Sequence, residues 1–230
     1  MAVAVLIPAA GYGKRMRSTK NKQFMLLKEK PVLIHTLEVF NANQNVSEII
    51  VITRDDEVEQ CKSLVTDYCL SKVKAVVAGG KERQHSVWNG LQVVSSNCET
   101  VVVHDGARPL LLHETLDNAI REVNTCKAVV VGVPVKDTIK VVDKEGIIIS
   151  TPPRSELWAV QTPQVFLKEL LIQAYEKAWQ NDYLATDDAA LVEKFGVNVK
   201  MILGTYENIK ITTPEDLVLA DAFLDRREKR

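Results

Sequence analysis

Short runs of consecutive apolar residues alternate along the chain with segments whose apolar positions recur at helical spacing. The runs are rich in Val and Ile and span 3–7, 49–53, 74–78, 100–104 and 128–133. The helical patterns between them span 32–40, 57–70, 86–94 and 114–123. Buried parallel strands are apolar on both faces, and helices form the crossovers between them. The alternation therefore predicts an α/β fold with a mostly parallel, doubly wound, Rossmann-like sheet.

The last third of the chain adds further elements to this fold. Helical patterns span 167–180 and 186–195, and the second opens on an N-cap signal, Thr186-Asp187-Asp188. A late strand is predicted over 198–203, and a final helix begins at Pro214 with Thr213 as its cap. No repeat, low-complexity tract or linker interrupts the chain, so we expect one domain over residues 1–230.

Residues 134–157 depart from the alternation. Two extended runs, 138–142 and 147–150, flank the turn 143–146, which is the pattern of a β-hairpin. Prolines bracket the segment, so we expect it to project from the sheet as an arm. Its aliphatic residues Ile147, Ile148 and Ile149 need a cover. A second subunit would supply one in a two-fold dimer, and the alternative is that the arm folds back on its own domain.

The loop after the first predicted strand carries the clearest chemical signal. It is small and glycine-containing, and five cations follow within nine positions: Lys14, Arg15, Arg17, Lys20 and Lys22. In open α/β sheets the loops at the carboxyl ends of strands form the ligand crevice. Bare backbone amides and cations there favour a polyphosphate. The loop matches neither the dinucleotide fingerprint nor the P-loop, and the alternative is a solvated basic surface.

Composition narrows the class of partner. The 230 residues carry a formal net charge of −1, which argues against general binding to nucleic acid or membrane surfaces. No apolar run approaches the ~18 residues of a membrane span, and no leader pattern precedes the first strand. The four cysteines, Cys61, Cys69, Cys98 and Cys126, lack metal-site spacing. They are typical of a reducing compartment, so we expect a cytoplasmic protein.

Polar residues gather at two further strand ends. Gly79-Gly80 precedes Arg83 and Ser86 at a helix start, where small residues permit close backbone approach. Asp105 follows the fourth strand and is a candidate contact for magnesium or a hydroxyl group. The alternative is that Asp105 caps the next turn and pairs with Arg108. We expect His104 to be a hydrogen-bonded residue of the core rather than a ligand.

Ordered motifs along the chain resemble one known family. They are Pro8-Ala9-Ala10-Gly11-x-Gly13-x-Arg15, Lys22-Gln23, Gly79-Gly80-x-Glu82-Arg83-x-x-Ser86, His104-Asp105-x-Ala107-Arg108-Pro109, Pro134-Val135-x-Asp137-Thr138, Gln161-Thr162-Pro163-Gln164, Thr186-Asp187-Asp188 and Asn208-Ile209-Lys210. Over residues 3–225 the chain closely resembles the 2-C-methyl-D-erythritol 4-phosphate cytidylyltransferases of the non-mevalonate isoprenoid route.

Three alternatives remain open beside this resemblance. The related ribitol-5-phosphate cytidylyltransferases typically carry Gly-Gly where this chain has Ala9-Ala10. A non-catalytic nucleotide-binding relative would usually lack a transition-state cation, whereas Arg15 and Lys22 are both present. A dehydrogenase is disfavoured because the third glycine of its fingerprint is missing.

The resemblance implies a nucleotidyltransferase that joins CTP and methylerythritol 4-phosphate and releases pyrophosphate. It implies Mg²⁺ or another divalent cation, held mainly by the CTP phosphates, with Asp105 the candidate protein ligand. It also implies a cytoplasmic homodimer in which Thr138 and Arg154 reach the substrate from the partner's arm. The implied catalytic residues are Arg15, Lys22, Arg154 and Lys210; the implied acceptor-binding residues are Asp105, Arg108, Thr138 and Thr186; the implied nucleotide-binding residues are Pro8, Ala9, Ala10, Gly11, Gly13, Gly80, Lys81, Arg83 and Ser86.

This sequence departs from the family pattern at two positions that bear on the site. Asn21 stands where the family commonly has proline, which predicts a more mobile loop around Lys22. Lys81 stands where many members have an acidic residue. It alters cytidine affinity if that position contacts the base through its side chain, and changes nothing if the contact is through the backbone.

Overall fold

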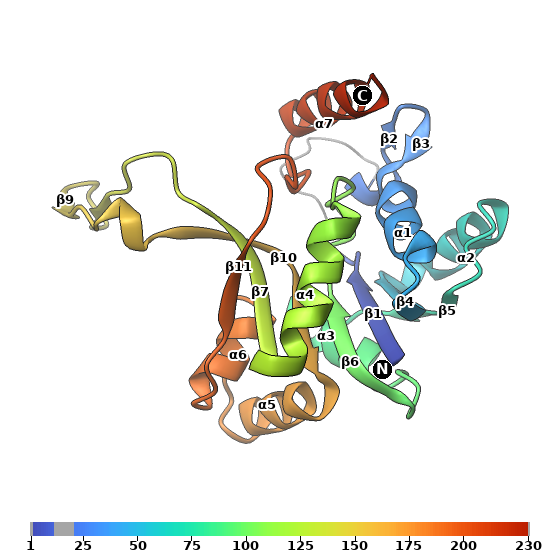
Figure 1. Ribbon diagram of the computed structural model, residues 1–230, viewed down its shortest axis with the longest axis horizontal. Coiled ribbons are helices and arrows are strands. Elements are labelled where there is room, and N and C mark those ends of the chain that lie inside the picture. The colour runs from blue at the N-terminus through green and yellow to red at the C-terminus, as the bar shows by residue number, and fades with distance from the viewer. Residues whose placement is uncertain (1, 12–20, 230) are drawn as a thin grey trace.

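A seven-stranded sheet forms the centre of the computed structural model, which describes residues 2–11 and 21–229. The strand order is β11-β7-β10-β6-β1-β4-β5, and all strands except β10 run parallel (Figure 1). Their bounds are β1 Ala2–Pro8, β4 Val46–Thr53, β5 Val73–Ala78, β6 Cys98–Val103, β7 Ala128–Pro134, β10 Trp158–Leu167 and β11 Lys200–Leu203. The predicted mostly parallel sheet is confirmed.

Helices cover both faces of this sheet. One core cluster joins α1, α2 and α4 to the sheet, and a second joins α3, α5 and α6 to its other face. Along β1, Val5 and Ile7 belong to the first cluster and Leu6 to the second, as the two-residue period of a strand requires. The helices are α1 Val32–Ala42, α2 Val58–Asp67, α3 Arg83–Leu91, α4 His113–Cys126, α5 Lys168–Gln180, α6 Asp188–Lys194 and α7 Pro214–Glu228, and short 3₁₀ turns are η2 Lys22–Phe24, η3 Asp55–Glu57 and η4 Arg154–Glu156.

The C-terminal helix packs beside the start of the chain. A third cluster joins α7 to α1 and to the small hairpin β2 (Leu26–Leu27) and β3 (Lys30–Pro31). Thr213 and Asp216 form the capping box that starts α7, which confirms the predicted cap. Just before this helix, the N–H of Ile211 donates to the carbonyl of Ala107 at 2.8 Å. Lys210 is thereby held next to the loop that follows β6.

Strand β10 is the one strand of the seven-stranded sheet that the sequence pattern missed, and the short strands β2 and β3 were not predicted either. Strand β10 lies antiparallel between β6 and β7, near the middle of the sheet. Its central residues Gln161, Thr162 and Pro163 interrupt the apolar run by which buried strands are recognised, and its register shifts between Val160 and Gln164. Residues 161–163 form no ladder pairs with either neighbouring strand. A proline is tolerated within a sheet at such an irregularity, because its missing N–H is not needed there.

The bounds of several helices also differ from the sequence pattern. Helix α3 begins at Arg83, three residues before the predicted start at Ser86, and it ends at Leu91. Helix α2 ends at Asp67 instead of residue 70. Helix ends are set by local capping contacts, which apolar periodicity does not report.

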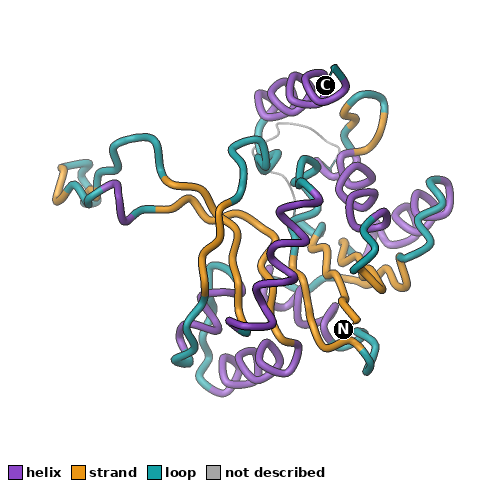
Figure 2. The backbone as a smooth tube through the Cα atoms, in the orientation of Figure 1, coloured by secondary structure: helices purple, strands orange, loops and turns teal. Residues whose placement is uncertain are grey.

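The predicted arm is present and projects from the sheet (Figures 1 and 2). Its paired strands are shorter than predicted, β8 being Val141–Val142 and β9 Ile148–Ser150. Ile147, Ile148 and Ile149 are 64%, 58% and 65% exposed, so the arm does not fold back on its own domain. At its base the Tyr206 hydroxyl donates to the carbonyl of Pro134 at 2.7 Å. Within the described residues, no helix is long and apolar enough to cross a membrane.

Candidate active site

A cavity of about 300 Å³ opens at the carboxyl ends of β1, β5 and β6. Its lining residues are Pro8, Ala10, Gly11, Lys22, Gln23, Gly80, Lys81, Glu82, Arg83, Ser86, Asp105, Gly106, Ala107 and Lys210. Most of the predicted nucleotide-binding residues therefore meet in one place, with Lys22 and Lys210. Gly13 and Arg15 lie outside the residues that the structure describes. We name this the first cavity.

The two glycines after β5 are required by crowding against the protein itself. A Cβ on Gly79 would lie 2.8 Å from the Ala10 Cβ and from the Ser86 Oγ. A Cβ on Gly80 would lie 2.4 Å from the His85 Cβ. The N–H of Gly80 donates to the Ser86 Oγ at 3.0 Å, which folds this loop onto the first turn of α3. Glycine at these two positions was predicted to permit close ligand approach, and it is also required by this packing.

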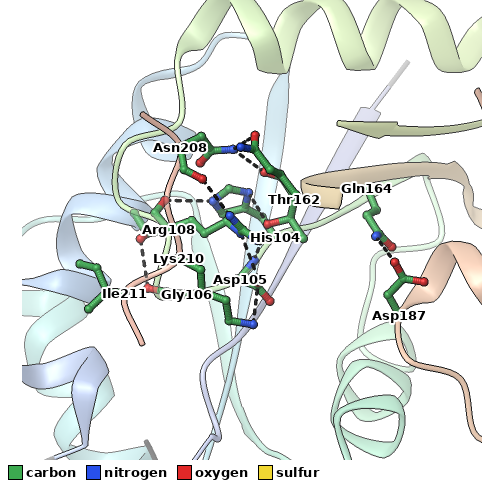
Figure 3. Close-up of polar contacts among 12 residues, drawn as sticks. His104, Asp105, Gly106, Arg108, Thr162, Gln164, Asp187, Asn208, Lys210 and Ile211 are labelled. Carbon is green, nitrogen blue, oxygen red and sulfur yellow. Dashed lines mark hydrogen bonds and ion pairs between the residues drawn. The ribbon is translucent and has the colours of Figure 1, made fainter. Parts of the chain in front are cut away.

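Asp105 lies at the centre of a cluster of cations (Figure 3). The Lys210 Nζ is 3.0 Å and the Arg108 Nε 3.2 Å from its Oδ2, and the Arg83 Nε is 4.0 Å from its Oδ1. Asp105 pairs with Arg108, as one of the two alternatives predicted, and it also lines the first cavity. Burial alone would raise the pKa of Asp105. Lys210, Arg83 and Arg108 together outweigh that effect and hold it below its ordinary value.

His104 is linked to this cluster by hydrogen bonds through Arg108 and Thr162 (Figure 3). The Arg108 carbonyl can only accept, so the His104 Nε2, 3.1 Å away, carries a proton and donates. Burial lowers the pKa of His104 to about 4, so the ring is neutral and its Nδ1 accepts from the Thr162 hydroxyl at 3.1 Å. The Thr162 oxygen in turn accepts from the backbone N–H of Asp105 at 3.0 Å. The predicted role of His104 as a hydrogen-bonded core residue is confirmed.

A second, smaller cavity of about 190 Å³ adjoins the first. It is lined by Arg83, Asp105, Arg108, Val160, Gln161, Thr162, Gln164, Thr186, Asp187 and Lys210. Arg83, Asp105 and Lys210 line both cavities and so mark the boundary between them. The predicted acceptor residues Asp105, Arg108 and Thr186 all meet in the second cavity.

Three predicted residues stand apart from both cavities. Thr138 and Arg154 lie exposed on the arm, where the Arg154 guanidinium donates to the Lys136 carbonyl at 2.6 Å. Ala9 is fully buried and packs in the core cluster beneath the first cavity, so its side chain is structural. Thr138 and Arg154 therefore do not line either cavity of the copy that carries them.

The predicted mobility around Lys22 is not supported by the contacts of Asn21. Asn21 is buried, and its amide group donates to both carboxylate oxygens of Glu57, at 3.1 and 3.0 Å. The Thr53 hydroxyl donates to the same carboxylate at 3.1 Å. These hydrogen bonds of Asn21 and Thr53 to Glu57, which we call the Glu57 clamp, therefore restrain the loop where proline would otherwise stiffen it. Lys22 follows directly, and its ammonium donates to the Ile211 carbonyl at 2.9 Å.

Asp105 is the carboxylate that both cavities offer to a divalent cation. Within the described chain, no group of three His, Cys, Asp or Glu side chains is arranged to hold a metal ion. Mg²⁺ typically binds one or two carboxylates together with substrate phosphates. Asp105, an ionised carboxylate on the boundary between the cavities, could supply one such carboxylate beside the phosphates of a bound substrate.

Several cavity residues were absent from the predicted site. Gln164 and Asp187 line the second cavity, and the Gln164 amide donates to the Asp187 carboxylate at 2.8 Å (Figure 3). Thr162 lines the same cavity. All three belong to motifs that carried the family resemblance, so motif membership was the signal that could have identified them.

A nucleotidyltransferase is the class of protein that this fold and site define, because a cation-lined cavity beside a glycine loop at the strand ends suits a nucleoside triphosphate. The chain belongs to the 2-C-methyl-D-erythritol 4-phosphate cytidylyltransferase family, whose model matches residues 3–226. The resemblance drawn from the motifs is confirmed.

Curated relatives and solved structures agree with this assignment. Relatives of that name from Caldanaerobacter subterraneus and Clostridioides difficile are each 48% identical, over 97% and 99% of this chain and 99% and 95% of their own lengths. The crystal structure of a 4-diphosphocytidyl-2C-methyl-D-erythritol synthase from Anaerococcus prevotii matches with TM-score 0.85 at 33% identity, covering 97% of this chain and 98% of its own. The cytidylyltransferase of Thermus thermophilus matches with TM-score 0.81 at 31% identity, covering 98% and 100%.

Proposed function

We propose that this chain joins CTP and 2-C-methyl-D-erythritol 4-phosphate to give 4-diphosphocytidyl-2-C-methyl-D-erythritol and pyrophosphate, a step in isoprenoid precursor biosynthesis. The observation that carries the proposal, beside family membership, is the pair of adjoining cavities with Arg83, Asp105 and Lys210 on their common boundary. Two phosphorylated substrates that react with each other need two such sites and a cationic boundary.

The chemistry needs charge neutralisation more than proton transfer. A phosphate oxygen of the acceptor attacks the α-phosphorus of CTP, a new P–O bond forms, and the bond to the β-phosphate breaks as pyrophosphate leaves. The nucleophile is already anionic at neutral pH, so no general base is required. The barrier is the approach of an anion to a polyanion, which fixed cations and in-line placement lower.

The proposed roles follow the lining of the two cavities. The first cavity would take CTP, with its backbone wall at Pro8, Ala10, Gly11 and Gly80 around the cytidine. The second would take the acceptor polyol. Lys22 and Lys210 would neutralise the reacting phosphates, together with Arg15. Mg²⁺ bound to the triphosphate would neutralise further charge, with Asp105 the protein carboxylate at its edge.

The arm extends the proposal to the assembly. Thr138 and Arg154 match family positions that hold the acceptor phosphate, and both are exposed on the arm. We propose a homodimer in which each arm completes the partner's second cavity. The apolar exposed tip of the arm supports this proposal, since a second copy would cover it. A reducing, cytoplasmic location is part of the same proposal and agrees with the four free cysteines.

The proposed reaction is tested by pyrophosphate release with CTP and Mg²⁺, offering methylerythritol 4-phosphate and ribitol 5-phosphate in parallel. We expect release with methylerythritol 4-phosphate only. Preference for ribitol 5-phosphate would keep the mechanism and change the acceptor. CTP binding without release for either acceptor would make the chain a non-catalytic nucleotide-binding relative.

A further inference from the structure

A buried acidic residue behind the site holds one of its cations. The Arg83 Nη2 lies 2.7 Å from the Asp188 Oδ2, while the Arg83 Nε lies 4.0 Å from Asp105. The Asp188 side chain is 1% exposed and lines neither cavity. Its other oxygen accepts from the Tyr175 hydroxyl at 2.6 Å. Arg83 therefore stands between one acidic residue in the site and one beneath it.

The surrounding elements bring Asp188 to this position. The Gln84 side chain, next to Arg83 on α3, donates to the Tyr183 carbonyl and accepts from the Ala185 N–H, at 3.1 and 3.0 Å. From β10, the Gln164 side chain accepts from the Ala189 N–H at 3.0 Å. The start of α6 is thus tied to α3 and to β10, the two elements that wall the second cavity.

This arrangement limits the freedom of the Arg83 guanidinium. Burial alone would lower the pKa of Arg83, and Asp188 and then Asp105 raise it above its ordinary value, so the charge is permanent. A buried ion pair contributes little net stability, because desolvation offsets the attraction. What the pair does supply is a fixed direction for a planar, long side chain.

We propose that Asp188, itself oriented by Tyr175, is a positioning residue that fixes the Arg83 guanidinium at the boundary where the CTP phosphates and the acceptor phosphate meet. The inference rests on the proposed cytidylyl transfer and adds a residue that touches neither substrate. Arg83 lines both cavities, so its placement affects both reactants.

The sign of the effect separates positioning from simple electrostatics. Asp188 is an anion near a site for polyanions, so its charge by itself weakens substrate binding. Replacing it with neutral asparagine would improve activity if charge alone mattered. Positioning predicts the opposite, because asparagine has one accepting oxygen in place of two for Arg83 and Tyr175, and it lacks the charge that holds the guanidinium.

The test begins with Asp188→Asn, Tyr175→Phe and a control, Glu193→Gln, which removes an exposed carboxylate from the same helix. We expect Asp188→Asn to lower kcat/KM about 10-fold or more, since small displacements of a reacting geometry cost up to ~100-fold. Tyr175→Phe should lower kcat/KM by a smaller factor, and the kcat/KM of Glu193→Gln should match that of wild type. Unchanged or increased activity of Asp188→Asn would overturn the inference.

A double-mutant cycle with Arg83→Met then asks whether Asp188 acts through Arg83. We expect Asp188→Asn to cause no further loss in the Arg83→Met background. Asp188→Asn should also make the Arg83→Met variant more stable against urea, because it removes a buried carboxylate that has lost its cation. The same fold loss in both backgrounds would show a general structural role and overturn the inference. If Asp188→Asn does not fold, Tyr175→Phe completes the same cycle.

A separate measurement distinguishes failure of the proposed cytidylyl transfer from failure of the positioning role of Asp188. If wild type binds CTP by calorimetry but releases no pyrophosphate with either acceptor, the transfer is wrong. The cycle is then measured on the dissociation constant for CTP, whose cavity Arg83 also lines. Coupling between Asp188 and Arg83 in that constant supports the positioning role, and additivity overturns it.

Discussion

At the residue scale, Asp105 explains how several cations can share one site before any phosphate is bound. Lys210, Arg108 and Arg83 would repel one another at this separation without a carboxylate among them. These cations hold the pKa of Asp105 below its ordinary value, against the effect of burial. Asp105 therefore stays ionised at neutral pH and lies among the cations that an incoming anion would meet.

Lys22 offers a direct test of charge neutralisation. It lines the first cavity, and its ammonium is held by the Ile211 carbonyl. We expect Lys22→Ala to lower kcat by ~10²–10³ while the dissociation constant for CTP changes much less, as for loss of a preorganised transition-state group. Steady-state kinetics and calorimetry measure the two quantities, with Lys62→Ala on the exposed face of α2 as control. Equal loss of affinity with unchanged kcat would make Lys22 a ground-state anchor.

His104 predicts a pH dependence of stability. Burial lowers its pKa from 6.5 to about 4, so below pH 6.5 the unfolded chain binds a proton that the native state does not. The stability this neutral ring contributes is fully present above pH 6.5 and is lost as pH falls toward 4. Between pH 7 and pH 5 the loss is about 2 kcal/mol.

Urea unfolding at pH 7 and pH 5 checks this effect against His104→Gln, which does not titrate. We expect the difference between the two pH values to be smaller in the variant by about that amount. An identical pH dependence in both proteins would mean that His104 titrates normally in the native state.

At the element scale, the loop at Asn21 shows how a departure from a family pattern can be compensated. Its amide joins η2 to the Glu57 carboxylate on η3, and Thr53 at the end of β4 holds the same carboxylate. The position of Lys22 thus depends on a polar contact between two short turns. The sequence pattern shows only that proline is absent.

Substitutions of Asn21 test this clamp. We expect Asn21→Ala to lower the free energy of unfolding by about 1–3 kcal/mol, because the buried Glu57 carboxylate loses two donors. Asn21→Asp should be worse, since it places a second carboxylate there, and Glu57→Gln combined with Asn21→Asp should recover part of the loss. Urea denaturation measures all three. An Asn21→Asp variant as stable as wild type would rule out the clamp.

At the scale of the whole molecule, the arm divides the candidate site residues between two places. Asp105, Lys22 and Lys210 lie at the cavities of one copy, whereas Thr138 and Arg154 lie on an arm that projects from it (Figure 1). A site that needs both sets requires a partner. Complementation between inactive variants can test that requirement.

Mixing Arg154→Ala with Asp105→Ala subunits should restore activity that neither variant has alone. A heterodimer contains one site with both residues intact, so an equal mixture with random exchange regains about a quarter of the wild-type sites. Mass spectrometry of the mixture confirms exchange. Absence of recovery after confirmed exchange would contradict a site shared between subunits.

The sequence predicted much of this molecule because its signals were local. Six of the seven sheet strands, their crossover helices and the arm appeared in the apolar pattern, since buried strands and amphipathic helices have distinct periods. The ordered motifs identified the family, and most of the predicted nucleotide-binding residues meet in the first cavity. The order of β1, β5 and β6 in a parallel sheet ensures this meeting, because their carboxyl ends share one edge.

Contacts between distant segments were decided only by the tertiary structure. Strand β10 is identified by its pairing with β6 and β7. Its sequence does not identify it, because Gln161, Thr162 and Pro163 interrupt the apolar pattern. The pairing of Arg83 with Asp188 joins residues 105 positions apart, and that of Lys210 with Asp105 again 105 apart. The sequence by itself determined which residue types stand at the strand ends. The tertiary structure decided which charges neutralise one another and which side chain holds another in place. The reason is that packing brings side chains of separate elements within 3 Å of each other.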